Sequence, residues 1–276
     1  MKNVLLIVVF LASSIQTSVA AEQSLAELPA AQKLAKLKAQ AMSADYRADI
    51  GELGRLHEEL GHWPKESELA YLARYWSGFA SWRMAINGAN RGMKSEELAA
   101  HLKEAAADFY VSIRLRDDFA DAYAAAALVS SWLAAFAAGD LPAIRERIAL
   151  SQALLAKASA LDPDNPRVLW ARGGFLLFAP ESQGGSIARA IDVYRRMLVE
   201  ASRRGVDAAS PLPDWGKPES LMSAAYAHLR QTPPDLSAAR REAAAALELQ
   251  PEWSYVRDNL LKEIDDRTPT EEKRHE

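Results

Sequence analysis

Two histidines near the end of an N-terminal helical stretch are the first residues that could do chemistry together. A helical zinc site needs two histidines four residues apart, so that both side chains lie on one face. His57 and His62 are five residues apart, which places them about 140° apart around a helix, and Gly61 favours a helix end between them. The other histidines show no ligand spacing: His101, His228 and His275. We therefore predict no metal site.

Two further patterns could be sites of chemistry. Gly184-Gly185-Ser186 precedes a predicted helix and could present backbone N–H groups to an anion. It lacks the Gly-Lys-Ser/Thr ending of a phosphate loop, and a flexible turn explains the glycines equally well. Glu58 and Glu59 are adjacent, so on a helix they point about 100° apart and cannot converge on one substrate. No serine lies in a nucleophile elbow, so we predict neither an enzyme nor a cofactor.

The arrangement of the chain is more informative than these isolated groups. Three Ala-rich amphipathic stretches end at Leu115, Leu161 and Leu249, which are 46 and then 88 residues apart, and 88 is twice 44. Each leucine is followed by an acidic or Pro-containing turn. Similarity at a fixed period in a helical pattern is typical of stacked helix pairs.

The helices expected from apolar periodicity and from turn residues form four pairs. Residues 30–60 predict one or two preceding helices, and a Pro-rich linker, Ser210–Pro218, separates the fourth pair from the third. Ser95 is predicted to be an N-cap. The pairs are 66–87 with 95–115, 119–138 with 141–161, 166–179 with 186–203, and 218–231 with 235–249, and they are followed by a closing helix at 253–265.

These pairs resemble the tetratricopeptide repeat (TPR) family. The best match is Asp162-Pro163-Asp164-Asn165-Pro166, followed by Gly173 in the first helix and by Ala190 and Tyr194 in the second. Gly173 matches the small residue at which the two helices of a repeat cross, whereas Arg172 replaces the usual Leu. The period of about 44 residues exceeds the family's 34 or so, so loops or helix ends are extended here.

A narrower resemblance rests on Asn165-Pro166-Arg167 and on Pro180 with Gly184-Gly185 before a helix. This pattern is similar to periplasmic repeat proteins such as the T component of TRAP-type transporters, which associates with substrate-binding proteins. The chain departs from that likeness because it contains no cysteine to carry a lipid.

Aromatic side chains concentrate on the first helix of each pair, and the resemblance implies that these helices line a concave groove. Aromatic walls with a few guanidinium donors would suit a peptide or a carboxylate ligand. The alternative is that most of these rings fill the core between helices. We select Tyr75, Trp82, Arg83 and Arg172 as the residues of a partner-binding groove.

The chain opens with a short basic start, Met1-Lys2-Asn3, which is followed by an apolar run, Val4–Ala12. Ser18-Val19-Ala20 then supplies the small residues that a signal peptidase reads. This pattern is typical of a secretory signal peptide, and the apolar run is shorter than the roughly 20 residues of a spanning helix. The absence of cysteine suits the bacterial periplasm. A net charge of −4 gives no reason to expect nucleic acid or an anionic membrane as partner.

The sequence therefore predicts an all-α protein, a TPR-like right-handed superhelix (α-solenoid) of about four helix pairs. Its expected parts are a signal peptide (1–20), an N-terminal helical cap (21–65), the repeat domain (66–265) and a charged, disordered tail (266–276). The predicted function is a non-enzymatic periplasmic scaffold that binds a protein or peptide, a periplasmic transport component among the candidates, in its concave groove. The alternative is a small-molecule carrier or transporter-associated protein that encloses a ligand within the superhelix.

Overall fold

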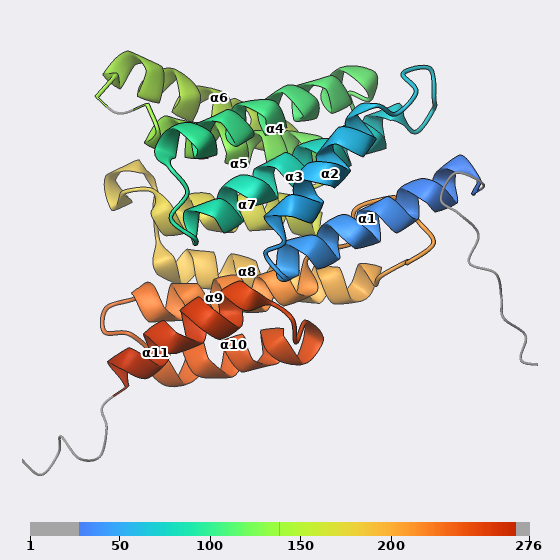
Figure 1. Cartoon of the computed structure of the whole chain (residues 1–276). Coiled ribbons are helices and arrows are strands. Elements are labelled where there is room, and N and C mark those ends of the chain that lie inside the picture. Colours follow the sequence, from blue (N-terminus) through green and yellow to red (C-terminus); the bar gives the residue numbers. More distant parts are fainter. Residues whose placement is uncertain (1–27, 138, 269–276) are drawn as a thin grey trace, which may run out of the picture.

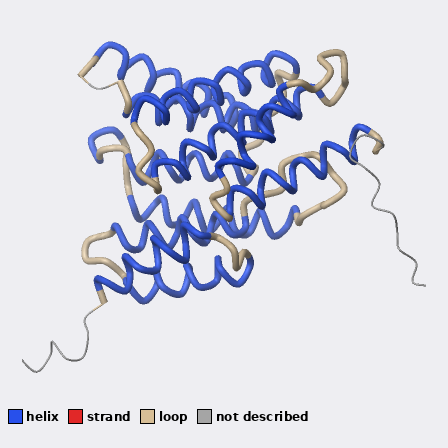
Figure 2. The backbone as a smooth tube through the Cα atoms, viewed as in Figure 1, coloured by secondary structure: helices blue, strands red, loops and turns tan. Residues whose placement is uncertain are grey.

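A computed structural model describes residues 28–137 and 139–268 of the chain, and every regular element in those residues is helical (Figure 2). The predicted signal peptide lies outside the described residues. The α-helices are α1 (Ala30–Tyr46), α2 (Ile50–Gly61), α3 (Ala70–Ala89), α4 (Ser95–Leu115), α5 (Ala120–Ala135), α6 (Leu141–Leu161), α7 (Pro166–Phe178), α8 (Ile187–Arg204), α9 (Lys217–Arg230), α10 (Leu236–Leu249) and α11 (Leu261–Arg267). Two short turns complete them, the 3-10 turn η2 (Glu181–Gln183) and the π-helical turn η3 (Val256–Leu260).

Helices that follow one another in the chain pack as pairs, α3 with α4, α5 with α6, α7 with α8, and α9 with α10. Figure 1 shows the pairs stacked in layers, from α4, α5 and α6 at the top to α9, α10 and α11 at the bottom. This stack confirms the predicted all-α solenoid of helix pairs. No helix in the described part of the chain is both long and apolar enough to cross a bilayer.

Most helix ends lie close to the capping and turn residues from which they were predicted. Asp140, Asn165, Ser186 and Asp235 each cap a helix by accepting a hydrogen bond from a backbone N–H of its first turn. Ser95 is not the N-cap that the sequence suggested. It is the first residue of α4, and the preceding Lys94 occupies the cap position without a side-chain hydrogen bond.

Two other boundaries differ from the expected ranges. The helix expected from residue 66 begins at Ala70, because the Ser67 N–H bonds the Pro64 carbonyl and the Ser67 hydroxyl accepts the Leu69 N–H, which makes a turn there. The closing helix begins at Ser254, passes through the π-helical turn and continues to Arg267, so the first two residues assigned to the tail are helical.

Small residues set the distance between paired helices. Gly173 of α7 faces Tyr194 of α8 so closely that a Cβ atom on Gly173 would lie 2.3 Å from the Tyr194 ring. The Tyr194 ring is buried against this gap. The predicted role of Gly173 as the crossing point of a helix pair is confirmed.

The segment between the third and fourth pairs is more than a linker. Residues 205–216, here called the return loop, run back along the stack to α1 and α3. Trp76 Nε1 donates to the Pro211 carbonyl at 2.8 Å, and Lys38 Nζ contacts Asp214 Oδ2 at 2.7 Å. Both donors are buried. The return loop therefore ties the second half of the chain to the first.

The two ends of the described chain also meet. The Tyr46 ring at the end of α1 packs edge-on against Trp253, with 5.1 Å between ring centroids, and the Ser254 hydroxyl donates to the Tyr46 carbonyl at 3.3 Å. The N-terminal helices thus pack on the first pair, as a cap would, and in addition reach the last pair.

The crossing at Gly173 gives a stability prediction with a matched control. Gly173→Ala should lower the free energy of unfolding by about 1–3 kcal/mol, because the new methyl group displaces Tyr194. Gly174→Ala next to it meets only Leu128 Cδ2 at 3.8 Å, and should raise stability by up to about 1 kcal/mol through helix propensity. Urea unfolding measures both variants, and equal effects at the two positions would contradict the close crossing.

Candidate functional site

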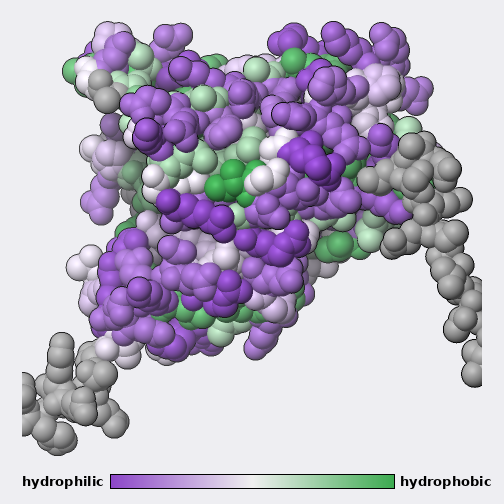
Figure 3. All heavy atoms as spheres, viewed as in Figure 1, coloured by the Kyte–Doolittle hydropathy of each residue, from purple (hydrophilic) through white to green (hydrophobic). Residues whose placement is uncertain are grey.

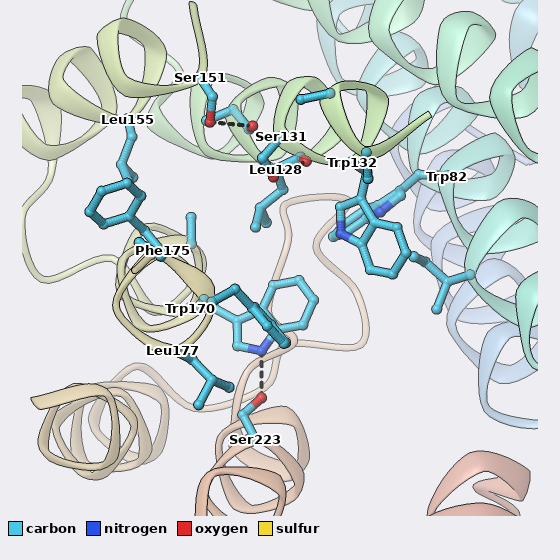
Figure 4. Close-up of a pocket in the computed structure, with 18 of the residues that line it drawn as sticks. Trp82, Leu128, Ser131, Trp132, Ser151, Leu155, Trp170, Phe175, Leu177 and Ser223 are labelled. Carbon is cyan, nitrogen blue, oxygen red and sulfur yellow. Dashed lines mark hydrogen bonds between the residues drawn. The ribbon is translucent and has the colours of Figure 1, made fainter. Parts of the chain in front are cut away.

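A cavity of about 680 Å³, partly open to solvent, lies between α3, α5, α6, α7, α8 and α9, with Trp253 and Tyr255 of the closing segment on one side. Figure 4 shows part of its wall, with Trp82 reaching in from α3, Trp132 from α5, and Trp170 and Phe175 from α7. The first helices of the pairs therefore supply most of the aromatic wall. On the face shown in Figure 3, hydrophilic residues cover most of the surface, with smaller hydrophobic areas between them.

The polar side chains of the wall bond mainly to the protein itself. The Ser131 hydroxyl donates to the Leu128 carbonyl at 2.7 Å, and the Ser151 hydroxyl donates to the Ala127 carbonyl at 2.8 Å. Trp170 Nε1 donates to the Ser223 hydroxyl at 2.7 Å, as the dashed line in Figure 4 shows. These donors already have acceptors, and other polar side chains of the wall, Asn90, Gln152 and Gln183, are exposed, so the wall presents a mainly apolar surface to an occupant.

Arg83 is the one charged side chain among the described residues that line the cavity, and its charge is matched. Its Nε donates to Asp45 Oδ1 at 2.7 Å, and the same carboxylate oxygen accepts from Asn87 Nδ2 at 2.8 Å. The guanidinium also stacks over the Trp82 ring, 5.3 Å from its centroid. Arg83 thus joins the wall to α1 and is not a free cation for a ligand.

Two tyrosines of the wall, Tyr255 and Tyr194, have raised pKa values. Burial raises the pKa of Tyr255 to about 12. Burial also raises the pKa of Tyr194 well above its ordinary value, while the hydrogen bond to Ser223 acts in the opposite direction. Neither phenol can supply a negative charge to pair with a cationic ligand.

The four residues selected from the sequence divide into two pairs. Trp82 and Arg83 line the cavity, and their role in binding a partner remains a prediction. Tyr75 and Arg172 do not line it. The selection of Tyr75 as an exposed groove residue is wrong, because its side chain is 0% exposed, packs against Phe109 and accepts the Trp215 Nε1 hydrogen bond at 3.2 Å.

The periodicity of the helices explains these two outcomes. Tyr75 and Trp82 are seven residues apart, so they share one face of α3, but the return loop covers the turn that carries Tyr75. Arg172 lies about 160° around α7 from Trp170, outside the arc that faces the cavity, and is half-buried there.

The sequence interpretation missed the contribution of a second helix, α6. Ile144, Ile148, Ser151 and Leu155 all line the cavity from α6. Their spacing of four, three and four residues is a helical stripe, which is the signal that could have revealed them. Trp253 and Tyr255 carried no such signal, because they come from the far end of the chain.

A serine, a histidine and an aspartate do meet elsewhere, although not as a catalytic triad. The Ser77 hydroxyl donates to Asp108 Oδ2 at 2.6 Å, and His57 Nδ1 lies 3.0 Å from the Ser77 hydroxyl. In a triad the histidine accepts the serine proton and the acid binds the other ring nitrogen. Here the acid binds the serine directly, and Ser77 is completely buried. The cluster, joined by Arg74 at 3.1 Å from Asp108, connects α2, α3 and α4.

The other candidate sites from the sequence have structural explanations. His62 bonds the Glu58 carbonyl through Nδ1 at 2.7 Å, away from the His57 cluster. Within residues 28–137 and 139–268, no group of three or more His, Asp or Glu side chains is placed to hold a metal ion. The Gly184-Gly185-Ser186 turn folds back onto α7, where its N–H groups bond the Glu181, Pro180 and Leu176 carbonyls. That turn therefore has no N–H group left for an anion.

Comparisons with known proteins give a structural likeness and no sequence match. No protein-family model and no curated protein matches the chain. Among solved structures, a thermophilic TPR protein from Thermus thermophilus is similar, with a TM-score of 0.49 and 16% sequence identity, over 84% of this chain and 98% of that one. Fold and cavity together define an α-solenoid of helix pairs with an apolar interior.

The buried carboxyl of Glu219 joins α9 to α1. Tyr46 donates to Glu219 Oε1 at 2.5 Å, and Glu219 Oε2 accepts the Gly216 N–H at 2.7 Å, which caps α9. Burial raises the pKa of Glu219 above its ordinary value of 4.5, while the Tyr46 hydroxyl partly opposes that rise. The folded protein thus holds this proton more tightly than the unfolded chain does.

This pKa shift predicts a pH-dependent stability. A raised folded-state pKa contributes stability that is complete below pH 4.5 and is lost as the pH rises through the folded-state value. The wild type should therefore lose stability relative to Glu219→Gln as the pH rises, as measured by urea unfolding at a series of pH values. Tyr46→Phe removes a group that favours the ionised carboxyl and should deepen the loss. A difference that stays constant with pH would contradict the assignment.

Proposed function

We propose that this protein is a non-enzymatic carrier that binds a small, mainly apolar molecule in the cavity. The observation that supports this proposal is the combination of volume and lining. The cavity of about 680 Å³ falls within the roughly 300–1,000 Å³ of ligand pockets, which are typically apolar with few polar groups. This is the second of the two functions predicted from the sequence.

The lining favours a small molecule over an extended peptide. Each peptide residue brings one backbone donor and one acceptor, and these groups are unfavourable to bury unless they are hydrogen-bonded. The serine and tryptophan groups of the wall at Ser151, Trp170 and Ser223 are already bonded to one another or to the backbone. A peptide main chain would find few partners here, whereas an apolar molecule needs none.

The protein-interaction scaffold is retained as a second candidate function because of two rings at the cavity mouth. Trp132 is 38% exposed and Phe178 is 69% exposed, and both line the cavity. Exposed aromatic rings beside a pocket are common anchors in protein interfaces, and curved helix-pair stacks offer extended binding surfaces. In this case a partner would insert an apolar side chain, with its main chain outside the cavity.

The expected location follows from the N-terminal signal pattern and is part of the proposal. A secretory signal would place the carrier in the periplasm, where it would hold an apolar molecule away from water. Delivery to a transport component there agrees with the narrower sequence resemblance described above.

A cavity-blocking variant tests the carrier function. Ser131 lies on the exposed side of α5 and lines the cavity, so Ser131→Trp should fill the space with an indole ring. Ser202→Trp is the matched control, because Ser202 is an exposed serine of α8 outside the lining. Titration with the neutral dye Nile red should show saturable binding to wild type and to Ser202→Trp, and at least about tenfold weaker binding to Ser131→Trp.

Native mass spectrometry of freshly purified protein complements the titration. A small mass that is carried by the wild type and lost in Ser131→Trp supports the carrier. If neither the dye nor a small mass binds, and a protein partner is captured through Trp132 and Phe178, the scaffold function replaces the carrier function.

A further inference from the structure

One buried hydrogen-bond donor in the cavity wall lacks a protein acceptor. Trp82 is 1% exposed, and its Nε1 has no hydrogen-bond partner. Three other buried side-chain atoms in the described residues share this condition, in Trp63, Asp214 and His228, and none of those residues lines the cavity. A buried donor without an acceptor is unfavourable, so the orphaned N–H needs an explanation where a ligand would bind.

The surroundings of Trp82 hold its ring in place while leaving the N–H unpaired. The ring packs against Trp170 at 5.6 Å between centroids and against Phe109 at 6.4 Å, and the Arg83 guanidinium lies over it. Trp170, the neighbouring indole, already donates to Ser223. The two indoles therefore differ in one respect: Trp82 alone can still donate a hydrogen bond.

We propose that the ligand carries a neutral hydrogen-bond acceptor, the carbonyl oxygen of an ester or ketone, which binds Trp82 Nε1. The remainder of the molecule is apolar and packs against Trp132, Trp170 and Phe175. This inference rests on the proposed carrier function and specifies its ligand class.

The charges of the wall exclude the charged alternatives. A carboxylate would lose its water while Arg83 is already bound to Asp45, and a buried charge without a partner is strongly unfavourable. An ammonium group would find no carboxylate, because no Asp or Glu among the described residues lines the cavity. A neutral acceptor avoids both penalties and satisfies the Trp82 N–H.

A series of probes with one chain length tests the ligand class. Methyl laurate, dodecane, laurate and dodecylammonium each compete with Nile red for the wild-type protein. Methyl laurate should bind about fivefold more tightly than dodecane, the effect of one neutral hydrogen bond, and both ions should bind more weakly than the ester.

Trp82→Phe keeps an aromatic ring and removes the N–H, so it should reduce the preference for the ester over dodecane to less than about twofold. Trp63→Phe is the matched control, since it removes the other orphaned indole N–H, which lies outside the cavity. That variant should retain the wild-type preference.

Nuclear magnetic resonance of the wild type provides a readout that needs no variant. In protein labelled with ¹⁵N-tryptophan, methyl laurate should move one indole N–H proton downfield, and dodecane should not. This measurement can contradict the proposal even if Trp82→Phe does not fold.

The outcomes separate the inference from the function on which it rests. If the ester preference survives in Trp82→Phe, if laurate or dodecylammonium binds as tightly as the ester, or if no indole signal distinguishes ester from alkane, the inference is wrong and the carrier function stands. If neither Nile red nor any probe binds the wild type, both are wrong.

Discussion

The buried ion pair between Arg167 and Asp121 is the interaction on which the rest of the structure depends. Arg167 Nε donates to Asp121 Oδ1 at 2.5 Å, and Arg167 Nη1 donates to the Trp215 carbonyl at 3.0 Å. Asn165 donates to the second oxygen of Asp121 at 2.8 Å. Because both charges are buried and their hydrogen bonds are shared among three segments, removing one partner would leave an uncompensated charge. This cluster fixes α5, α7 and the return loop relative to one another.

Long-range contacts hold the helices that form the cavity in place. An open stack of helix pairs presents a curved groove to solvent. Here Trp76 and Lys38 hold the loop against α3 and α1, and Tyr46 joins the first helices to the last pair. No residue of the return loop lines the cavity, which is partly open to solvent and is bordered by Trp253 and Tyr255 of the closing segment. Burying apolar surface there favours an apolar guest, because the gain from removing apolar surface from water grows with the area buried.

Sequence reasoning predicted the local structure well and the long-range contacts not at all. Periodicity, capping residues and prolines act over a few residues, so they gave the bounds of α4 and α6 and the crossing at Gly173. Contacts of the return loop and of Tyr46 join residues more than a hundred positions apart, and no local pattern encodes them. For the same reason the pattern could not separate Trp82, which faces the cavity, from Tyr75, which shares its helical face and is covered.

The central claim is that the cavity is preformed and mainly apolar. Crystallography under xenon pressure tests this claim most directly. Apolar cavities stay free of water and bind xenon, whereas polar ones hold ordered water. The account predicts strong xenon density beside Trp82, Trp132 and Trp170 without rearrangement of the helices. A chain of ordered waters in that space, or side chains collapsed into it, would contradict the account.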